Sequence, residues 1–229
     1  MNNQFETTGY PYAVSDLQVK NRVLRNTYWL LALTMVPTVL GAWIGVESGI
    51  TQRMGFMGSL LFLAIAFGGI FAIEKTKESI TGVYVLLGFT FFMGLMLSSL
   101  IGTVLGFKNG GELVMTAFAG TAGVFFAMAS LSTIIKRDLS SLGKWLFVGV
   151  IMLIAGSLIN IFIGSTAVML VISVASIGIF SAYMLYDLKQ IVDGGETNYI
   201  SATLTLYLDI INVFQSLLAL LGILGGERE

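Results

Sequence analysis

The amino-acid sequence predicts an all-α polytopic membrane protein with seven transmembrane helices and no second domain. Hydrophobic residues make up 56% of the 229 residues and charged residues only 11%, a balance that no soluble domain of this length could bury in one core. The chain holds seven continuous apolar stretches, and about 20 apolar residues cross the roughly 30 Å hydrocarbon core of a bilayer. Lipid offers the backbone no hydrogen-bond partners, and continuous apolar runs lack the alternation of barrel strands, so each span is expected to be an α-helix.

The predicted spans follow one another with short loops between them. They cover Thr27–Gly45, Met54–Ile73, Val83–Leu105, Leu113–Leu131, Trp145–Ile163, Ala167–Leu188 and Ala202–Leu224. These bounds divide the chain into an amino-terminal tail of residues 1–26, a seven-helix transmembrane domain of residues 27–224 and a short carboxyl-terminal tail of residues 225–229. The first tail is polar and has no short apolar region with a cleavage site, so we expect no cleaved signal peptide.

The distribution of basic residues predicts the orientation in the membrane. If the amino terminus is cytoplasmic, three basic residues, Arg53, Lys108 and Arg228, fall outside. The nine on the inner side are Lys20, Arg22, Arg25, Lys75, Lys77, Lys136, Arg137, Lys144 and Lys189. Because basic residues concentrate in cytoplasmic segments, this bias favours a cytoplasmic amino terminus, and seven spans then place the carboxyl terminus on the far side.

Composition also excludes several kinds of chemistry. The chain has no Cys, which removes disulfides, thiolate metal sites and cysteine nucleophiles. It has no His, so a response to pH between about 5 and 8 would have to come from carboxylates in unusual surroundings. A net charge of −1 without a large basic patch gives no reason to propose nucleic acid as a partner.

Asp209 lies inside the last apolar run, where a carboxylate is costly. A charged side chain at the bilayer centre costs roughly 2.5 to 3.5 kcal/mol on insertion scales, so an intramembrane Asp is expected to be functional by default. Thr205, Asp209, Asn212 and Ser216 fall at i, i+4, i+7 and i+11, which places them on one helical face. We interpret this face as a polar path, the alternative for Asp209 being a structural residue hydrogen-bonded to Tyr, Asn or Thr of neighbouring helices.

The preceding span carries Ser176, Tyr183 and Asp187 on one face, with Asp187 near its cytoplasmic end. Asp187 and Asp209 meet only if this helix leaves the membrane late or tilts; otherwise Asp187 is an interfacial carboxylate that reaches water. If they meet, both cannot ionise cheaply, and the pair would share a proton and respond to cytoplasmic pH. Deprotonation would make them repel, part the two helices and expose oxygen ligands that calcium accepts.

Several segments carry a family resemblance. Leu185-Tyr186-Asp187, then the run from Gly194 to Ile200 (GGETNYI) and the run from Leu206 to Asn212 (LYLDIIN) resemble the closing segment of the Bax inhibitor-1 family, also called the transmembrane Bax inhibitor motif family. Arg25-Asn26-Thr27-Tyr28 is similar to the short proteobacterial, YccA-like branch. The resemblance covers the whole chain.

The resemblance implies a fold, a site and a location. It implies about seven spans with the last helix central among the other six, and it matches Asp187 and Asp209 to the pH-sensing aspartate pair and calcium site of a family associated with pH-dependent calcium leak. In a bacterial relative an arginine at the end of the second helix pairs with these aspartates. This chain has no arginine there, so Lys75 or Lys77 is the candidate basic latch, although a lysine lacks the bidentate fork of arginine. The implied location is the bacterial inner membrane.

Two functional hypotheses follow. The first is a calcium or other cation leak controlled by Asp187 and Asp209, without a bound cofactor. The alternative, also implied by the resemblance, is a regulator of the membrane protease FtsH and of stress survival, which would use the exposed tail Met1–Lys20 and the span surfaces. We do not expect an enzyme, because no metalloprotease, serine hydrolase or intramembrane aspartyl protease motif is present.

Overall fold

The computed structural model describes residues 11–53 and 55–227. This part of the chain is built from eight α-helices and contains no strand. They are α1 (Pro11–Ser48), α2 (Ile50–Arg53), α3 (Gly55–Thr76), α4 (Ile80–Leu105), α5 (Gly110–Ile134), α6 (Leu142–Ile163), α7 (Thr166–Asp193) and α8 (Tyr199–Gly225). The predicted all-helical class is therefore confirmed for the described residues.

Most of these helices have the length and composition of membrane spans. Within the described residues, six are long and apolar enough to cross a bilayer: α4 to α8, and α1 from Gln18 onward. The remaining long helix, α3, has 22 residues and corresponds to the predicted span Met54–Ile73. The protein is thus a polytopic helical membrane protein, and six of the seven predicted spans meet this criterion.

The helices extend beyond the predicted apolar windows because polar and glycine caps lie outside those windows. The Asn198 side chain accepts hydrogen bonds from the backbone N–H groups of Ile200 and Ser201 at the start of α8 (2.8 and 3.1 Å). Gly194 ends α7 with φ +83°, a conformation that glycine adopts without strain. As a result α7 continues past Asp187 to Asp193, and Asp187 lies inside the helix.

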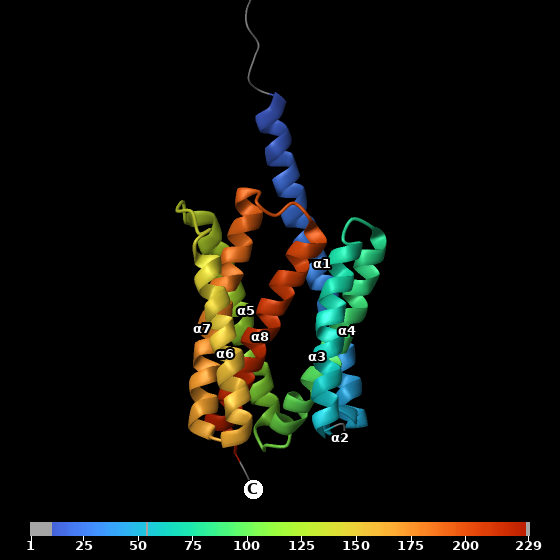
Figure 1. Ribbon diagram of the computed structural model, residues 1–229, viewed down its shortest axis with the longest axis vertical. Coiled ribbons are helices and arrows are strands. Elements are labelled where there is room, and N and C mark those ends of the chain that lie inside the picture. The colour runs from blue at the N-terminus through green and yellow to red at the C-terminus, as the bar shows by residue number, and fades with distance from the viewer. Residues whose placement is uncertain (1–10, 54, 228–229) are drawn as a thin grey trace, which may run out of the picture.

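The first helix differs most from its predicted span. α1 begins at Pro11, so residues 11–26, which the sequence analysis assigned to a tail, continue the first span as one helix that projects beyond the bundle (Figure 1). The Lys20 side chain packs over Gly194, at the carboxyl end of α7. Positive charge is favourable there because the carbonyl end of a helix carries partial negative charge.

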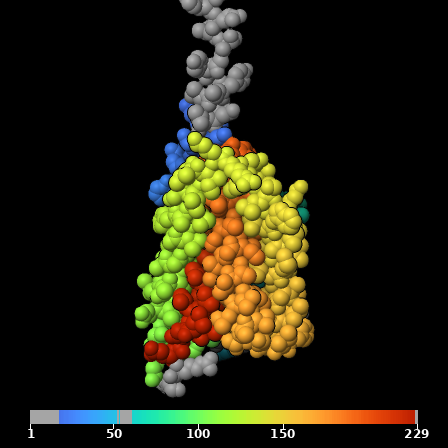
Figure 2. Space-filling model, turned by 90° about the vertical axis from the view of Figure 1, so that its left-hand side faces the viewer, coloured from blue at the N-terminus to red at the C-terminus, as the bar shows by residue number. Residues whose placement is uncertain are grey.

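The bundle has two groups of helices with α8 between them (Figure 1). α1, α3 and α4 lie on one side of α8, and α5, α6 and α7 lie on the other. In the described part of the chain, α8 contacts α1, α3, α4, α5 and α7, whereas α6 packs only on α7. The predicted central position of the last helix therefore holds for every long helix except α6. Figure 2 shows α8 reaching the surface between α5 and α7 near its carboxyl end.

The inside and outside of the bundle are both apolar, as expected in lipid. The buried core centres on α8 and includes Leu206, Tyr207, Val213 and Leu218, all fully buried. On the outside, large apolar side chains such as Trp29, Trp145 and Phe162 are exposed, Phe162 by 89%. A soluble protein rarely exposes so much contiguous apolar surface, so these faces are suited to lipid.

Small residues bring α1 and α4 into close backbone contact. A Cβ added to Gly41 would lie 2.1 Å from the carbonyl oxygen of Phe91, and one added to Gly94 would lie 2.0 Å from that of Thr38. No side chain fits at such distances, so these glycines allow the helices to approach. Gly88 on another face of α4 meets no atom within 4 Å, so glycine is not sterically required there.

Candidate functional site

The central feature of the candidate site is the antiparallel pair α7 and α8. A short connection, residues 194–198, reverses the chain between the glycine cap of α7 and the Asn198 cap of α8. This reversal places the polar face of α8 against the polar face of α7. Ser176 on α7 and Ser216 on α8 demonstrate the register, since their hydroxyl oxygens are hydrogen-bonded at 2.8 Å.

Asp187 and Asp209 come together at this interface. Their carboxyl groups lie within hydrogen-bonding reach of each other, and the Thr205 hydroxyl lies within reach of Asp187. Asp209 is 5% exposed, and its Oδ2 finds no hydroxyl or amide partner among the described residues. Asp187 is partly exposed. The alternative in which Asp187 is only an interfacial carboxylate turned toward water does not fit this contact.

The rest of the predicted polar path lines the same interface. Thr205 is exposed on the cytoplasm-proximal part of α8, Asn212 is partly buried and donates to the carbonyl oxygen of Leu208 at 2.7 Å, and Ser216 binds Ser176. Asn212 and Ser176 also line a groove of about 250 Å³ between α6, α7 and α8. Beyond Ser216, the residues of α8 are apolar or glycine as far as Gly225.

The candidate latch lysines lie at the end of α3, away from the two aspartates. Lys77 Nζ pairs with Glu74 Oε2 at 2.8 Å, and Lys75 is exposed. Glu74 in turn accepts a hydrogen bond from the Ser201 hydroxyl of α8 at 2.8 Å through its other oxygen. Lys77 therefore acts on α8 through Glu74 and not through direct contact with an aspartate.

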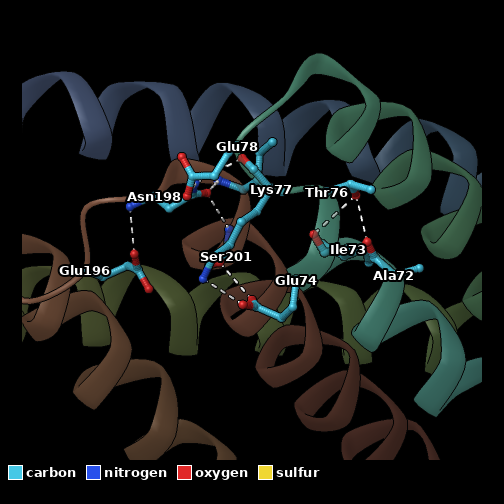
Figure 3. A network of polar contacts seen from close by, with 10 residues as sticks. Ala72, Ile73, Glu74, Thr76, Lys77, Glu78, Glu196, Asn198 and Ser201 are labelled. Atoms are coloured by element: carbon cyan, nitrogen blue, oxygen red, sulfur yellow. Dashed lines mark hydrogen bonds and ion pairs between the residues drawn. The ribbon is translucent and has the colours of Figure 1, made fainter.

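Figure 3 shows that this contact belongs to a larger network between the α3–α4 turn and the start of α8. The Asn198 side-chain amide donates to the carbonyl oxygen of Lys77 at 3.0 Å and to Glu78 Oε1 at 3.2 Å. Glu196 Oε1 accepts from the Asn198 backbone at 2.7 Å. Partial burial opposes ionisation of Glu74, but hydrogen bonds from Lys77 and Ser201 outweigh it and lower the pKa of its carboxyl.

The residues near the aspartate pair offer few ligands for a resident metal ion. No group of three or more Asp, Glu, His or Cys side chains that could hold a metal occurs within the described residues. Calcium takes six to eight oxygen ligands, whereas two carboxylates supply about four at most. The site is better suited to a passing or weakly held cation than to a permanent calcium ion.

Comparison with known families places the chain. A family model described as "Inhibitor of apoptosis-promoting Bax1" matches residues 20–226. The chain belongs to this Bax inhibitor family. The match covers α8 and all but the first part of α1, and it confirms the resemblance inferred from the residues around Asp187 and Asp209.

Curated relatives of this Bax inhibitor protein come from several bacteria. An uncharacterized membrane protein of Vibrio cholerae is 38% identical over 207 residues, which cover 90% of this chain and 92% of the relative. The Escherichia coli K12 protein named "Modulator of FtsH protease YccA" is 36% identical over 208 residues, covering 91% and 93%. A second Escherichia coli relative with the same identity and coverage is named "Inner membrane protein YccA".

The structure of this family member also contains a polar cluster that the sequence analysis did not single out. The Tyr207 hydroxyl lies 2.9 Å from the Thr38 hydroxyl and donates to the carbonyl oxygen of Thr90 at 3.3 Å. Tyr207 and Thr90 are fully buried, and Thr38 is nearly so. Thr27, Thr34 and Thr38 recur at i, i+7 and i+11, the one signal that could have indicated a second polar face on the first span.

Proposed function

We propose that this protein modulates an FtsH-type protease of the bacterial inner membrane. The observation that carries the proposal is 36% identity across 91% of the chain to the Escherichia coli protein named a modulator of FtsH protease. The projecting part of α1 supports it, because a helix that stands clear of the bundle is accessible to a membrane-anchored partner (Figure 1). The predicted contact segment Met1–Lys20 lies in part outside the described residues.

The experiment is co-reconstitution of the purified chain with the protease and a membrane-protein substrate. We expect the parent to slow degradation of the substrate. A variant lacking residues 2–10 should slow it less, because the proposed contact is shortened, while Asp209→Asn should behave as the parent. If the chain has no effect on degradation at any ratio to the protease, the proposal is wrong.

We propose a pH-controlled leak of calcium or a related cation as a second function. The specific observation in its favour is the contact between Asp187 and Asp209, with Oδ2 of Asp209 buried and without another partner in the described structure. Two carboxyls in contact are accommodated best when they share a proton. Loss of that proton leaves two like charges at a helix interface, which favours separation of α7 and α8.

Other polar residues have supporting roles in this second proposal. Thr205, Asn212 and Ser216 form the path on α8 and would replace part of a cation's hydration shell with neutral oxygens. Lys77 contributes to the closed arrangement through Glu74 and Ser201, as an indirect form of the predicted latch. Neither proposed function assigns catalysis or a bound cofactor.

The leak is tested by calcium flux into proteoliposomes from about pH 5 to pH 8. We expect flux that changes with pH in the parent and loses that dependence in Asp209→Asn and Asp187→Asn. Glu112→Gln on α5 is a control, since it removes a carboxylate far along the chain from the pair. A parent that carries no calcium at any pH would leave protease modulation as the one proposed function.

Both proposals use the same orientation: seven spans with the amino terminus in the cytoplasm. The support is the match between charge and architecture. The basic connections α3–α4, α5–α6 and α7–α8 lie at the same end of the bundle as the start of α1 (Figure 1). That end carries nine of the twelve basic residues of the sequence.

A further inference from the structure

Hydrogen bonds hold α8 to the α1–α4 side of the bundle at both of its ends. At its amino end, Ser201 binds Glu74 at the end of α3, and Asn198 binds the carbonyl oxygen of Lys77 in the following turn. At its carboxyl end, the side-chain amide of Asn109, in the α4–α5 connection, donates to the carbonyl oxygen of Gly225 at 2.7 Å. The oxygen of the same amide accepts from the backbone of Glu227 at 3.1 Å.

The middle of α8 is bonded to the same side. The Tyr207 hydroxyl joins Thr38 of α1 and the carbonyl oxygen of Thr90 of α4, and Gly94 of α4 lies directly against the backbone of Thr38. Hydrogen bonds between helices resist separation in lipid, where a released polar group finds no water. α1, α4 and α8 are therefore joined at three levels.

The opposite side of α8 is held differently. Among the described residues, one hydrogen bond, between Ser176 and Ser216, links a side chain of α5, α6 or α7 to α8, apart from the contacts of Asp187 with Thr205 and Asp209. The remaining contacts of α5 and α7 with α8 are apolar. Apolar helix faces lose little on separation in a membrane, since lipid tails are as apolar as leucine.

We propose that the protein moves as two units, α1, α3, α4 and α8 against α5, α6 and α7, and that charge on the aspartate pair separates them. The pair lies on the boundary, with Asp187 on one unit and Asp209 on the other. This inference deepens the proposed leak, because it identifies which interface opens.

The surroundings of the pair do not offset its charge. Tyr183 on α7 and Glu196 in the α7–α8 connection are the other titratable groups that interact with it, and Glu196 adds negative charge. Lys189 of α7 is engaged with Asp193. No Lys or Arg of α1, α3, α4 or α5 acts on either carboxyl within the described part of the chain. Repulsion between the two carboxylates would therefore not be neutralised by a neighbouring cation.

The absence of cysteine from the sequence allows a matched cross-linking experiment. Ser176→Cys with Ser216→Cys crosses the boundary, at hydroxyl oxygens 2.8 Å apart. Thr51→Cys with Ser98→Cys lies within the first unit, on α2 and α4, at hydroxyl oxygens 3.0 Å apart. Both pairs are oxidised in proteoliposomes from about pH 5 to pH 8, and the ratio of the two rates cancels the common effect of thiol ionisation.

We expect the ratio of boundary to control cross-linking to fall by about fivefold or more as the pH rises, within the range of typical couplings between sites. In Asp209→Asn the ratio should stay constant. A ratio that is independent of pH in the otherwise unchanged chain, or a boundary pair that never cross-links, would overturn the two-unit inference.

Flux measured on the same preparations separates this inference from the leak itself. A ratio that changes with pH without calcium flux keeps the two units and removes the leak. Flux that depends on pH with a constant ratio keeps the leak and removes the two units. If both hold, the oxidised boundary pair should abolish flux and reduction should restore it, while the oxidised control pair should leave flux unchanged.

Discussion

Tyr207 is the largest fully buried side chain of the described residues, and its hydroxyl bonds to two other helices. We expect Tyr207→Phe to destabilise the protein by about 1 kcal/mol, because the ring still fills its site while the hydroxyl bonds are lost. Unfolding in mixed detergent micelles measures this change. Tyr84→Phe on exposed α4 surface is the matched control and should have no effect; equal losses in the two variants would contradict the structural role of the Tyr207 hydroxyl.

Glu74 predicts a specific dependence of stability on pH. Burial opposes its ionisation, but the bonds from Lys77 and Ser201 lower the pKa of Glu74 below its ordinary value. A group with a lowered pKa in the folded state stabilises the protein above its unfolded pKa, about 4.3, and loses that contribution as the pH falls through the lower folded value. Glu74→Gln should therefore be less stable than the parent at pH about 7, and the difference should shrink below pH about 4. A constant difference at all pH values would argue against an ionised Glu74 in the network.

The proximity of the two aspartates could be predicted from the sequence, whereas the contacts of Glu74 could not. Thr205, Asp209, Asn212 and Ser216 repeat with helical period inside an apolar run, so their common face stands out. Glu74 lies in a turn of mixed charge, where nothing in the sequence specifies that Ser201, 127 residues further on, will face it. Contacts between loops depend on how the helices pack, and that information is absent from local periodicity.

The interface between α1 and α4 depends on the glycines that let the two backbones touch. A methyl group at Gly94 would lie 2.0 Å from the carbonyl oxygen of Thr38, so Gly94→Ala must push the helices apart. We expect a loss of about 1 to 3 kcal/mol or more, and the shift should also break the Tyr207 bond to Thr38. Gly88→Ala on the same helix meets open space and should be neutral or stabilising. Similar thermal stability of the two variants in detergent would contradict the observed packing.

The existence of the long helices was predictable, and their ends were not. Apolar runs reveal the part of a helix that lies in lipid, so every predicted span has a counterpart in the structure. The polar turns before α1 and after Asp187 were missed because hydropathy does not distinguish a polar helical segment from a polar loop. The short helix α2 has too few residues to produce a periodic signal.

The arrangement of the whole bundle makes a prediction about orientation. Single cysteines at Lys136, in the α5–α6 connection, and at Lys108, in the α4–α5 connection, should lie on opposite sides of the membrane, since these connections are at opposite ends of α5. In intact spheroplasts, a membrane-impermeant maleimide should label the cysteine at position 108 and not that at 136. The reverse pattern would place the amino terminus outside the cytoplasm.

The two proposed functions use different parts of the molecule. Modulation of a protease requires the projecting start of α1 and the outer surfaces of the helices, whereas the leak requires the aspartate pair between α7 and α8. Substitutions at Asp209 should therefore leave protease modulation intact, and deletions before Pro11 should leave cation flux intact. A variant that loses both activities while remaining folded would indicate that they share one mechanism.

The most direct test of protease modulation is the rate at which a reconstituted FtsH-type protease degrades a membrane protein, with and without this chain in the same vesicles. The account predicts slower degradation in the presence of the parent, equally slow degradation with Asp209→Asn, and recovery toward the unmodulated rate when residues 2–10 are removed. An unchanged degradation rate in the presence of excess parent protein would contradict it.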